Sequence, residues 1–427
     1  MDPRELLLDS FNAAIAAADP RLIVPRHLPP DLPKGRTLVV GAGKAAAAMA
    51  LAVENHWRKD ALLNGIVVTR YGHGLPLKRI TVVEAGHPLP DERGEQAARE
   101  ILAEVEKLGP DDLLLCLLSG GGSSLLSLPV AGVSMDDLQS ATRELLRCGA
   151  AIQEINTVRK HLSAVQGGRL AASCRAPVLA LIISDVTGDD PAHIASGPCA
   201  PDPTTCSDAL AILERYRINA PVAVMETLRT GTRDKHNEAP KPGDAVFSHV
   251  ENRVIATAHY SLLAAAEYFR GHGVPAVMLG DSVTGEARDV AKVFAALAKE
   301  IRQYGQPWNP PVALISGGET TVTVRADGRG GRGGRNAEFL LSLVIQLNGL
   351  PQVHALACDT DGIDGSENNA GAIATPDSLH RATKMGINAA ALLAVNDAYT
   401  FFEQIGDLVF TGPTRTNVND YRAILIL

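Results

Sequence analysis

The chain has 427 residues and a formal net charge of −8, with 46% hydrophobic and 21% charged residues. This length exceeds what one ordinary hydrophobic core supports, so we expect two domains. The acidic balance argues against nucleic acid as a partner, and no apolar run approaches the ~20 residues that a membrane helix needs.

The cysteines and the first residues indicate the compartment. The six cysteines form no Cys-x-x-Cys pair and have no regular spacing, which is typical of reduced thiols. The opening residues MDPRELLLDS carry acids where a signal peptide carries basic residues ahead of an apolar stretch. We therefore expect a cytoplasmic enzyme with no membrane or nucleic-acid partner. The sequence leaves the oligomeric state open, a homodimer included.

Short runs rich in Val, Ile and Leu alternate with helix-like stretches through the first half of the chain. These runs cover residues 36–43, 64–70, 80–86, 112–122 and 176–185. Strands that alternate with helices predict a parallel sheet with helices on both faces. We expect an α/β, Rossmann-like N-terminal domain.

A polar segment rich in Gly and Pro, residues 228–247, predicts the linker, so we place the domains at 1–235 and 236–427. The later strand-like runs cover residues 249–257, 274–281, 310–319, 320–326, 353–359 and 421–427. The run 320–326 alternates polar and apolar residues, as a half-buried or edge strand does. The second domain is therefore expected to be α/β with a mixed sheet.

Gly-rich turns follow several predicted strands, where open α/β sheets bind ligands. The turns are Gly41-Ala42-Gly43-Lys44, Ser119-Gly120-Gly121-Gly122-Ser123-Ser124 and Ser316-Gly317-Gly318-Glu319. Glycine permits positive φ and close backbone approach, so successive N–H groups can converge on an anion. The two Ser-Gly-Gly turns, one per domain, predict that phosphates or carboxylates are held between the domains. The alternative is that these glycines only serve tight turns.

The first of these turns also fits a dinucleotide fingerprint. Gly41, Gly43 and Ala46 satisfy G-x-G-x-x-[GA] between a strand and an Ala-rich helix. The second strand ends at Arg70 instead of an acid, which would suit a 2′-phosphate. An NADP-linked reductase is therefore an alternative. A P-loop is excluded, because no Gly-Lys-Ser or Gly-Lys-Thr closes a glycine run.

Two charged segments of the first domain are candidate binding elements. Residues 155–171 include Lys160 within a basic cluster, whose alternative interpretation is a solvated helix face. Residues 184–198 follow a strand and carry Asp185 and Asp189, which could orient a nucleophile or hold Mg²⁺. The neighbouring His193 has no His or Cys partner at zinc spacing, so zinc is not expected.

Two segments of the second domain carry further candidates. Arg335 and Asn336 end the glycine-rich stretch 328–336, and a guanidinium suits the charge on a transferring phosphoryl group. Residues 357–372 contain Asp359 and Asp361, but the spacing of the acids does not match an EF-hand loop. We expect Asp359 and Asp361 to serve a Mg–nucleotide or the cleft, and the alternative is that they only stabilise a turn. The later acids of the segment, Asp364 and Glu367, are expected to be capping residues.

Eight segments together resemble a known family, the glycerate 2-kinases of the MOFRL type, over nearly the whole chain. They are GAGKAAAAMA, SGGGSSLL, INTVRKHLSAVQGGRLA, SDVTGDDPAHIASGP, SGGET, GRGGRNAEF, ACDTDGIDG and GPTRTNVND. The resemblance implies a Rossmann-like domain joined to a smaller α/β MOFRL domain, with the active site in the interdomain cleft. It also implies ATP- and Mg²⁺-dependent phosphorylation of D-glycerate to 2-phosphoglycerate.

The resemblance also implies roles for individual residues. By motif match, the family's active-site lysine falls on Lys44 and its arginine on Arg335. We expect Lys44 to bind the glycerate carboxylate or the transferring phosphoryl group, and Arg335 to stabilise the equatorial oxygens. Asp185 or Asp189 would orient the attacking hydroxyl or Mg²⁺, and the turn from Ser119 to Ser124 would cradle phosphates.

Two alternatives of other kinds stay open. Sequences of this type are also named hydroxypyruvate reductases in a tartrate-degradation context, which would fit the fingerprint but leave Arg335 without a role. A non-catalytic binder of phosphorylated metabolites would use the Ser-Gly-Gly turns alone.

Overall fold

The computed structural model describes residues 2–234, 237–324 and 331–427, which divide into two compact units. The N-terminal unit consists of residues 20–255, and the C-terminal unit consists of residues 1–19 and 256–427. Across the described residues, no helix has the length and apolar character needed to cross a membrane.

The N-terminal unit is built on a six-stranded sheet. Its strands are β1 (Thr37–Ala42), β2 (Leu63–Arg70), β3 (Ile80–Ala85), β4 (Leu113–Leu118), β5 (Val178–Ile183) and β6 (Val250–Ala256). The strand order is β3-β2-β1-β4-β5-β6, and the pairs from β3 to β5 are parallel. This is the order of the doubly wound nucleotide-binding fold, which confirms the Rossmann-like prediction. Strands β1 and β5 are fully buried because both faces of the sheet are covered.

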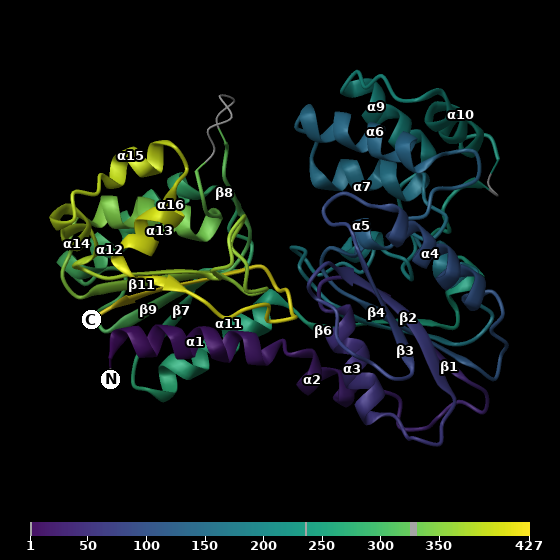
Figure 1. Ribbon diagram of the computed structural model, residues 1–427, viewed down its shortest axis with the longest axis horizontal. Helices are drawn as coiled ribbons and strands as arrows, with labels where there is room; N and C mark the ends of the chain where they lie inside the picture. The colour runs from purple at the N-terminus through teal and green to yellow at the C-terminus, as the bar shows by residue number, and fades with distance from the viewer. Residues whose placement is uncertain (1, 235–236, 325–330) are drawn as a thin grey trace. The chain divides into compact units, whose positions relative to one another are not determined.

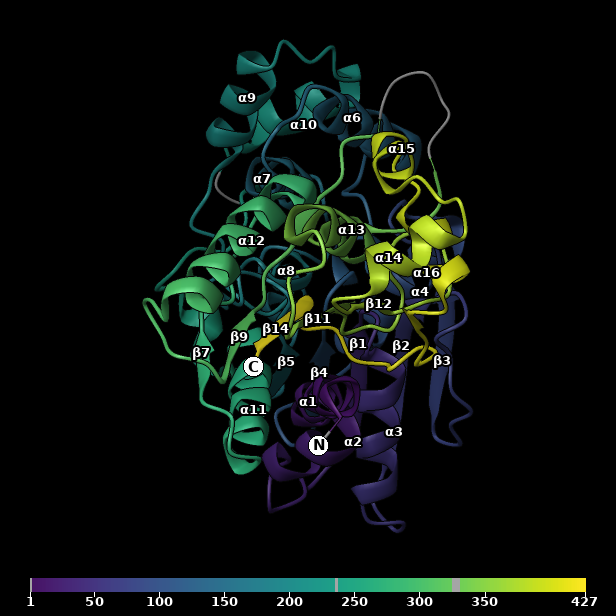
Figure 2. The same ribbon diagram turned by 90° about the vertical axis from the view of Figure 1, so that its left-hand side faces the viewer.

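Helices cover this sheet and also form a second core. They are α2 (Pro20–Ile23), α3 (Ala46–His56), α4 (Glu92–Val105), α5 (Gly122–Leu125), α6 (Met135–Arg147), α7 (Ile152–His161), α8 (Arg169–Ala172), α9 (Cys206–Arg215) and α10 (Val222–Gly231). The apolar side of α4 packs mainly on β2 and β3. Helices α6, α7, α9 and α10 share a separate apolar core and lie together in Figure 2.

The division of the chain differs from the predicted boundary. The position 235/236 falls on residues outside the described ones, and the compact units divide at 255/256 instead. The run 249–257, predicted to open the second domain, is β6 at the edge of the first sheet. Its Val250 and Val254 pack against the core of that sheet, which explains why this strand stays with the N-terminal unit.

The C-terminal unit contains a mixed six-stranded sheet and a short two-stranded one. The strands are β7 (Ala276–Met278), β8 (Gly285–Glu286), β9 (Val312–Ser316), β10 (Thr320–Thr321), β11 (Val353–Asp359), β12 (Gly371–Ala374), β13 (Leu408–Val409) and β14 (Asp420–Ile426). The larger sheet has the order β13-β12-β11-β14-β9-β7. Its pairs are antiparallel except β7 with β9, which confirms the predicted mixed sheet. The predicted strand 320–326 is shorter, and its last two residues lie outside the described ones.

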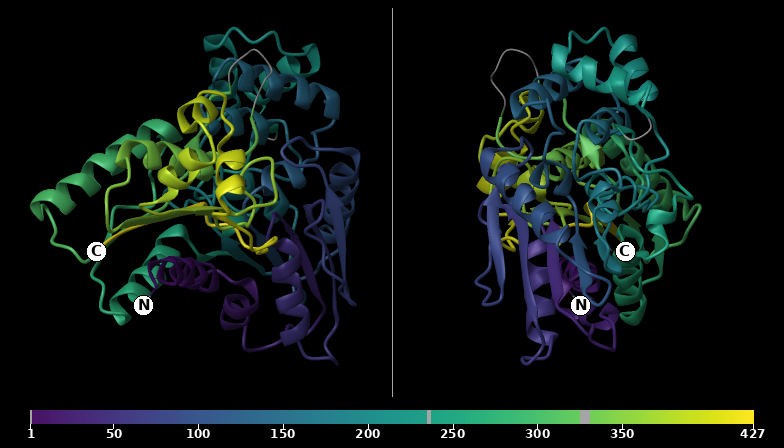
Figure 3. Two further views of the ribbon diagram at one scale, coloured as in Figure 1. Left: turned by 60° about the vertical axis from the view of Figure 1, so that its left-hand side comes forward. Right: turned by 90° about the vertical axis from the view of Figure 1, so that its right-hand side faces the viewer.

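Helices cover both faces of this larger sheet. They are α1 (Pro3–Ala17), α11 (Ala258–Gly271), α12 (Ala287–Tyr304), α13 (Arg335–Leu347), α14 (Ser378–Lys384), α15 (Ala389–Ala394) and α16 (Ala398–Ile405). Helices α12 and α13 pack on one face, and α1 with α11 pack on the other (Figure 1). The left view of Figure 3 shows the same arrangement, with the purple α1 beneath the yellow strands of this unit.

Helix α1 joins a sheet formed by residues hundreds of positions later. It begins at Pro3, after Asp2, whose side chain accepts a hydrogen bond from the Arg4 N–H. Phe11 stacks on Tyr421 of β14 with the ring centroids 5.6 Å apart, and the Tyr421 hydroxyl donates to Ser10 at 2.8 Å. The first residues of the chain therefore contribute to the core of the C-terminal unit.

We predict that Phe11→Ala lowers the free energy of unfolding by about 3–5 kcal/mol, because the buried ring leaves a cavity against Tyr421. Val293→Ala on the exposed side of α12 should change it by less than about 0.5 kcal/mol. Urea unfolding of both variants measures the difference. Equal, small losses would contradict the packing described for α1.

Candidate functional site

The turn after β1 packs closely against the turn after β4. Gly43 has φ +137°, and a β-carbon at this position would lie 2.1 Å from the Ser119 Oγ. A β-carbon on Gly41 would lie 2.2 Å from the Leu117 carbonyl oxygen. Both glycines are thus required by the neighbouring strand.

The N–H groups of this first turn are all bonded within the protein. Gly43 donates to the Val68 carbonyl at 3.1 Å, and Lys44 donates to the Gly120 carbonyl at 2.9 Å. Ala45 donates to the Ser119 Oγ at 3.0 Å, and Ala46 donates to the Gly43 carbonyl at 3.1 Å. In this arrangement Gly41 and Gly43 pack strands together, which differs from the anion-binding role predicted for them.

The turn after β4 differs from the turn after β1 in the hydrogen bonding of its N–H groups. In the described part of the chain, no acceptor receives the backbone N–H groups of Gly120, Gly121 and Ser123. Gly121 has φ +81°, and its N–H and that of Ser123 belong to half-buried residues. A left-handed residue in such a turn directs successive N–H groups toward one point, which forms an anion-binding nest. Of the predicted turns, this one has the geometry for a phosphate or a carboxylate.

Side chains from two other segments hold the second turn in place. The Ser123 carbonyl accepts hydrogen bonds from Arg159 at 2.6 Å and from Gln166 at 2.8 Å. Ser196 donates to the Ser123 hydroxyl at 2.8 Å from a backbone with φ +59°. A non-glycine residue in this left-handed region is strained, and such strain persists where the surroundings impose it. Burial lowers the pKa of Arg159 to about 10.

Lys160 has a structural environment instead of the predicted ligand-binding one. Its side chain is 1% exposed, and the ammonium group pairs with Asp202 at 2.7 Å. Beside it, the Nε2 of His161 lies 3.0 Å from Glu238, and its Nδ1 donates to the Thr157 carbonyl at 2.9 Å. The alternative of a solvated basic face is wrong for both residues, because they are buried.

His161, Cys206 and Glu238 place a nitrogen, a sulfur and an oxygen within 4.8 Å of one another. Burial raises the pKa of the Cys206 thiol to about 12, so the sulfur is protonated. Arg169 and Lys241 act on this thiol with their positive charges. Glu238 acts on the same thiol with its negative charge, so charges of both signs surround this cluster.

The predicted acids of the 184–198 segment lie at the carboxyl end of β5, next to β4 in the sheet. Asp185 and Asp189 are half-buried, and Asp189 has φ +54°. Asp190 accepts a hydrogen bond from the Ala192 N–H at 2.9 Å and serves the loop. The positions of Asp185 and Asp189 suit their predicted roles, which stay predictions.

In the C-terminal unit, Arg335 is surrounded by carboxylates. At the start of α13, its guanidinium lies 2.7 Å from Asp359, 2.8 Å from Asp420 and 3.1 Å from Glu319. Asp359 and Asp420 are register partners on adjacent strands, so their side chains share the face of the sheet covered by α13. Burial works to lower the pKa of Arg335, but the three carboxylates raise it above its ordinary value.

Asp420, the last residue of the segment GPTRTNVND, and Arg422 link Arg335 to the turn from Ser316 to Glu319. Asp420 also accepts from Asn336 at 2.8 Å and from Arg422. Arg422 is fully buried and donates to the Gly317 carbonyl at 2.9 Å. The sequence signal for these two residues is their spacing. They are two charged residues, two positions apart, in an otherwise apolar C-terminal run, so their side chains lie on the same face of the strand.

The turn from Ser316 to Glu319 is held by Gly280, which follows β7, and by Asp420 of β14. Gly317 donates to the Gly280 carbonyl at 2.9 Å, and the Gly318 carbonyl accepts from Asp420 at 3.1 Å. The buried Ser316 hydroxyl has no hydrogen-bond partner in the described residues. The predicted ligand roles of Ser316, Gly317 and Gly318 stay predictions.

The acids that follow β11 mainly bond within the protein. Asp359 accepts from the Asp361 N–H at 3.0 Å in addition to Arg335, and Asp361 accepts from the Ile363 N–H at 2.9 Å. These are turn and ion-pair contacts, so they support a positioning role more directly than the predicted metal role.

Asp364 caps α13, as predicted. It accepts from the N–H groups of Asn336 and Ala337 at 3.0 and 2.8 Å. Burial raises its pKa to about 6. Glu367 instead pairs with Arg332 at 3.2 Å at the surface.

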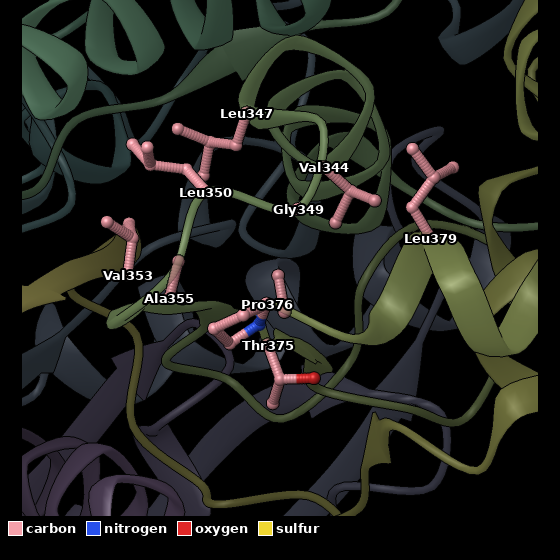
Figure 4. Close-up of a pocket in the computed structure, with 10 residues that line it drawn as sticks. Val344, Leu347, Gly349, Leu350, Val353, Ala355, Thr375, Pro376 and Leu379 are labelled. Atoms are coloured by element: carbon pink, nitrogen blue, oxygen red, sulfur yellow. The ribbon is translucent and has the colours of Figure 1, made fainter.

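A small cavity lies at the other end of α13 (Figure 4). It has a volume of about 10 Å³ and is lined by apolar side chains such as Val344, Leu347 and Leu379. This space holds at most one water molecule, so it is a packing defect and no substrate site.

The sequence matches known proteins over its full length. Residues 6–229 match a domain of unknown function, DUF4147, and residues 312–420 match the MOFRL family. The chain is 51% identical to a putative hydroxypyruvate reductase of Agrobacterium vitis, over 99% of this chain and 94% of the relative. It is 40% identical to a glycerate 2-kinase of Pyrococcus horikoshii, over 98% and 96%. The crystal structure of a glycerate kinase from Thermotoga maritima has a TM-score of 0.88 and 39% identity, covering 99% of both chains.

We predict that Lys160→Met lowers the free energy of unfolding by about 3–5 kcal/mol, because Asp202 would remain as an uncompensated buried charge. Lys107→Met removes an exposed pair with Glu104 and should cost less than about 1 kcal/mol. Urea unfolding of the two variants measures both values. A small loss for Lys160→Met would show that this ion pair is not a structural element.

Proposed function

Because this chain belongs to the family that joins a DUF4147 domain to a MOFRL domain, we propose that it is a glycerate kinase. The reaction is the transfer of the terminal phosphoryl group of ATP to D-glycerate, with Mg²⁺, to give 2-phosphoglycerate. The observation that carries the proposal is the contrast between two turns of one sheet. The turn at Gly43 has bonded N–H groups, whereas the turn at Gly121 presents N–H groups for an anion.

The same contrast disfavours a nicotinamide-dependent reductase. The Agrobacterium relative is named a putative hydroxypyruvate reductase. In a dinucleotide-binding turn, the glycines let the pyrophosphate approach the backbone. Here the corresponding space at Gly43 is filled by Ser119, and the N–H groups of Lys44 and Ala45 are already bonded. A pyrophosphate at this turn would have to displace contacts between β1 and β4.

The residues suit phosphoryl transfer, which depends on positioning and charge neutralisation more than on covalent chemistry. The N–H groups of Gly120, Gly121 and Ser123 fit phosphate oxygens, and the Lys44 side chain, whose Cγ lies 3.6 Å from a β-carbon built on Gly121, carries a positive charge. In the C-terminal unit, the three carboxylates orient Arg335, which we assign to the charge that develops on the transferring group.

The carboxylate oxygens of Asp185 and Asp189 are of the type that Mg²⁺ prefers, and we assign them to the metal or to the attacking hydroxyl. When bound, Mg²⁺ would neutralise phosphate charge. Asp359 suits this role less well, because its two oxygens bond to Arg335 and to the Asp361 N–H.

Two assays on one preparation test the proposal. The first follows ADP release from ATP, Mg²⁺ and D-glycerate, and identifies the product by NMR. The second follows NADH and NADPH oxidation with hydroxypyruvate. We expect ADP release that gives 2-phosphoglycerate, without oxidation of either cofactor. Oxidation of a cofactor without ADP release would contradict the kinase and support the reductase.

We predict that Arg335→Ala lowers kcat for ADP release by about 10³-fold or more. Among the described residues, no other positive charge would replace the guanidinium that Asp359 and Asp420 hold in place. Arg332→Ala removes a surface arginine of the same segment, paired with Glu367, and should change kcat by less than about threefold. Steady-state kinetics, with circular dichroism as the check on folding, compare the two. Similar kcat values for both variants would remove Arg335 from the proposed mechanism.

A further inference from the structure

His87 is a histidine at the carboxyl end of the first sheet that neither the sequence motifs nor the proposed mechanism uses. It follows β3 by two residues and is half-buried. The carboxyl ends of parallel strands are where sheets of this type bind ligands. His87 therefore comes from the same edge of the sheet as the turns after β1 and β4.

The imidazole of His87 lies directly against the open turn. A β-carbon built on Gly121 would lie 3.0 Å from both the Cδ2 and the Nε2 of His87. The same point lies 3.6 Å from the Cγ of Lys44. The ring edge that carries Nε2 and the Lys44 side chain thus both flank Gly121. A β-carbon at position 121 would contact the ring more tightly than is usual, and the positive φ of this residue itself favours glycine.

This arrangement brings three kinds of donor to one place. The turn supplies the backbone N–H groups of Gly120, Gly121 and Ser123, for which the described residues offer no acceptor. The Lys44 side chain, placed beside Gly121 by its Cγ, ends in an ammonium group. His87 supplies an imidazole nitrogen whose hydrogen bonds to anions are strengthened by charge when the ring is protonated. Phosphate and carboxylate groups have several acceptor oxygens and match such a set.

We propose that His87 is a ligand-binding residue that donates from Nε2 to the anionic group held by the turn from Gly120 to Ser123. The inference rests on the anion-binding role of this turn in the proposed function. The anionic group is either the phosphate chain of the nucleotide or the carboxylate of the acid substrate.

A purely structural role for His87 makes a different prediction. In that case the ring would only fill space beside Gly121 and support the loop after β3, in which Gly86 packs closely on Leu89 and Asp91. A leucine would preserve most of this packing, and a glutamine would have no advantage over it. A binding role instead requires a side-chain N–H, which glutamine keeps and leucine lacks.

The test is isothermal titration calorimetry of full-length protein with two probes, Mg-ADP and D-glycerate. The variants are His87→Leu and His87→Gln, and the control is His56→Leu at the exposed C-terminal end of α3. We expect His87→Leu to weaken one probe by about 10-fold to 100-fold, and His87→Gln to recover most of that loss. A loss confined to ADP identifies the nucleotide phosphates as the group bound, and a loss confined to D-glycerate identifies the carboxylate. His56→Leu should leave both affinities unchanged.

Three results would overturn the inference: unchanged affinities in His87→Leu, equal losses in the leucine and glutamine variants, or wild-type protein that binds neither probe. Failure of the proposed function gives a different result. In that case the wild type binds ADP without releasing it from ATP and D-glycerate, while the effect of His87 on ADP affinity is still measured.

Discussion

The contact between Gly43 and Ser119 is the constraint on which the chemistry of the N-terminal unit depends. It allows the turns after β1 and β4 to lie side by side, and the Ser119 hydroxyl accepts a hydrogen bond from the Ala45 N–H. The N–H groups of the turn after β1 are consequently bonded to other protein groups. At this edge of the sheet, the turn after β4 is therefore the one that can bind an anion. Rigid support of Ser123 by Arg159, Gln166 and Ser196 keeps that second turn in an open form.

In the C-terminal unit, a side chain instead of backbone N–H groups supplies the positive charge for an anion. The N-terminus of α13 is already capped by Asp364, so the helix end itself does not present N–H groups of Asn336 and Ala337 to a ligand. Arg335 supplies the positive charge there, and the strand carboxylates fix its orientation. Because Asp420 is also tied to the buried Arg422, the guanidinium is held by the sheet and not by a flexible loop. Such preorganisation is what electrostatic stabilisation of a transferring group requires.

The sequence predicted much of this fold, because hydrophobic alternation and apolar runs report directly on strands and covered sheets. The parallel first sheet and the mixed second sheet follow from those patterns. The unit boundary did not follow, since the polar segment near residue 235 resembles a linker whereas the pairing of β6 with the first sheet is a long-range choice. The placement of α1 against β14, about 400 residues later, has the same cause.

The candidate site was predictable as a set of motifs but not as an assembly. Glycine spacing shows where a tight turn occurs, yet it does not show which N–H groups remain unbonded, and that difference separates Gly43 from Gly121. Likewise, the sequence around Lys160 predicts a ligand-binding basic cluster, because it does not show that Asp202, from a distant loop, pairs with Lys160. Asp420 and His87 lie outside the Gly-rich motifs, so only the three-dimensional structure brings them to Arg335 and Gly121.

A crystal structure of the protein with Mg-ADP and D-glycerate tests the central claim most directly. The account predicts an anionic group of one ligand within hydrogen-bonding distance, about 3 Å, of the Gly121 and Ser123 nitrogens, with the bonds of the Gly43–Ala45 turn intact. A phosphate seated on the Gly43–Ala45 turn, with the Ser119 contact broken, would contradict it.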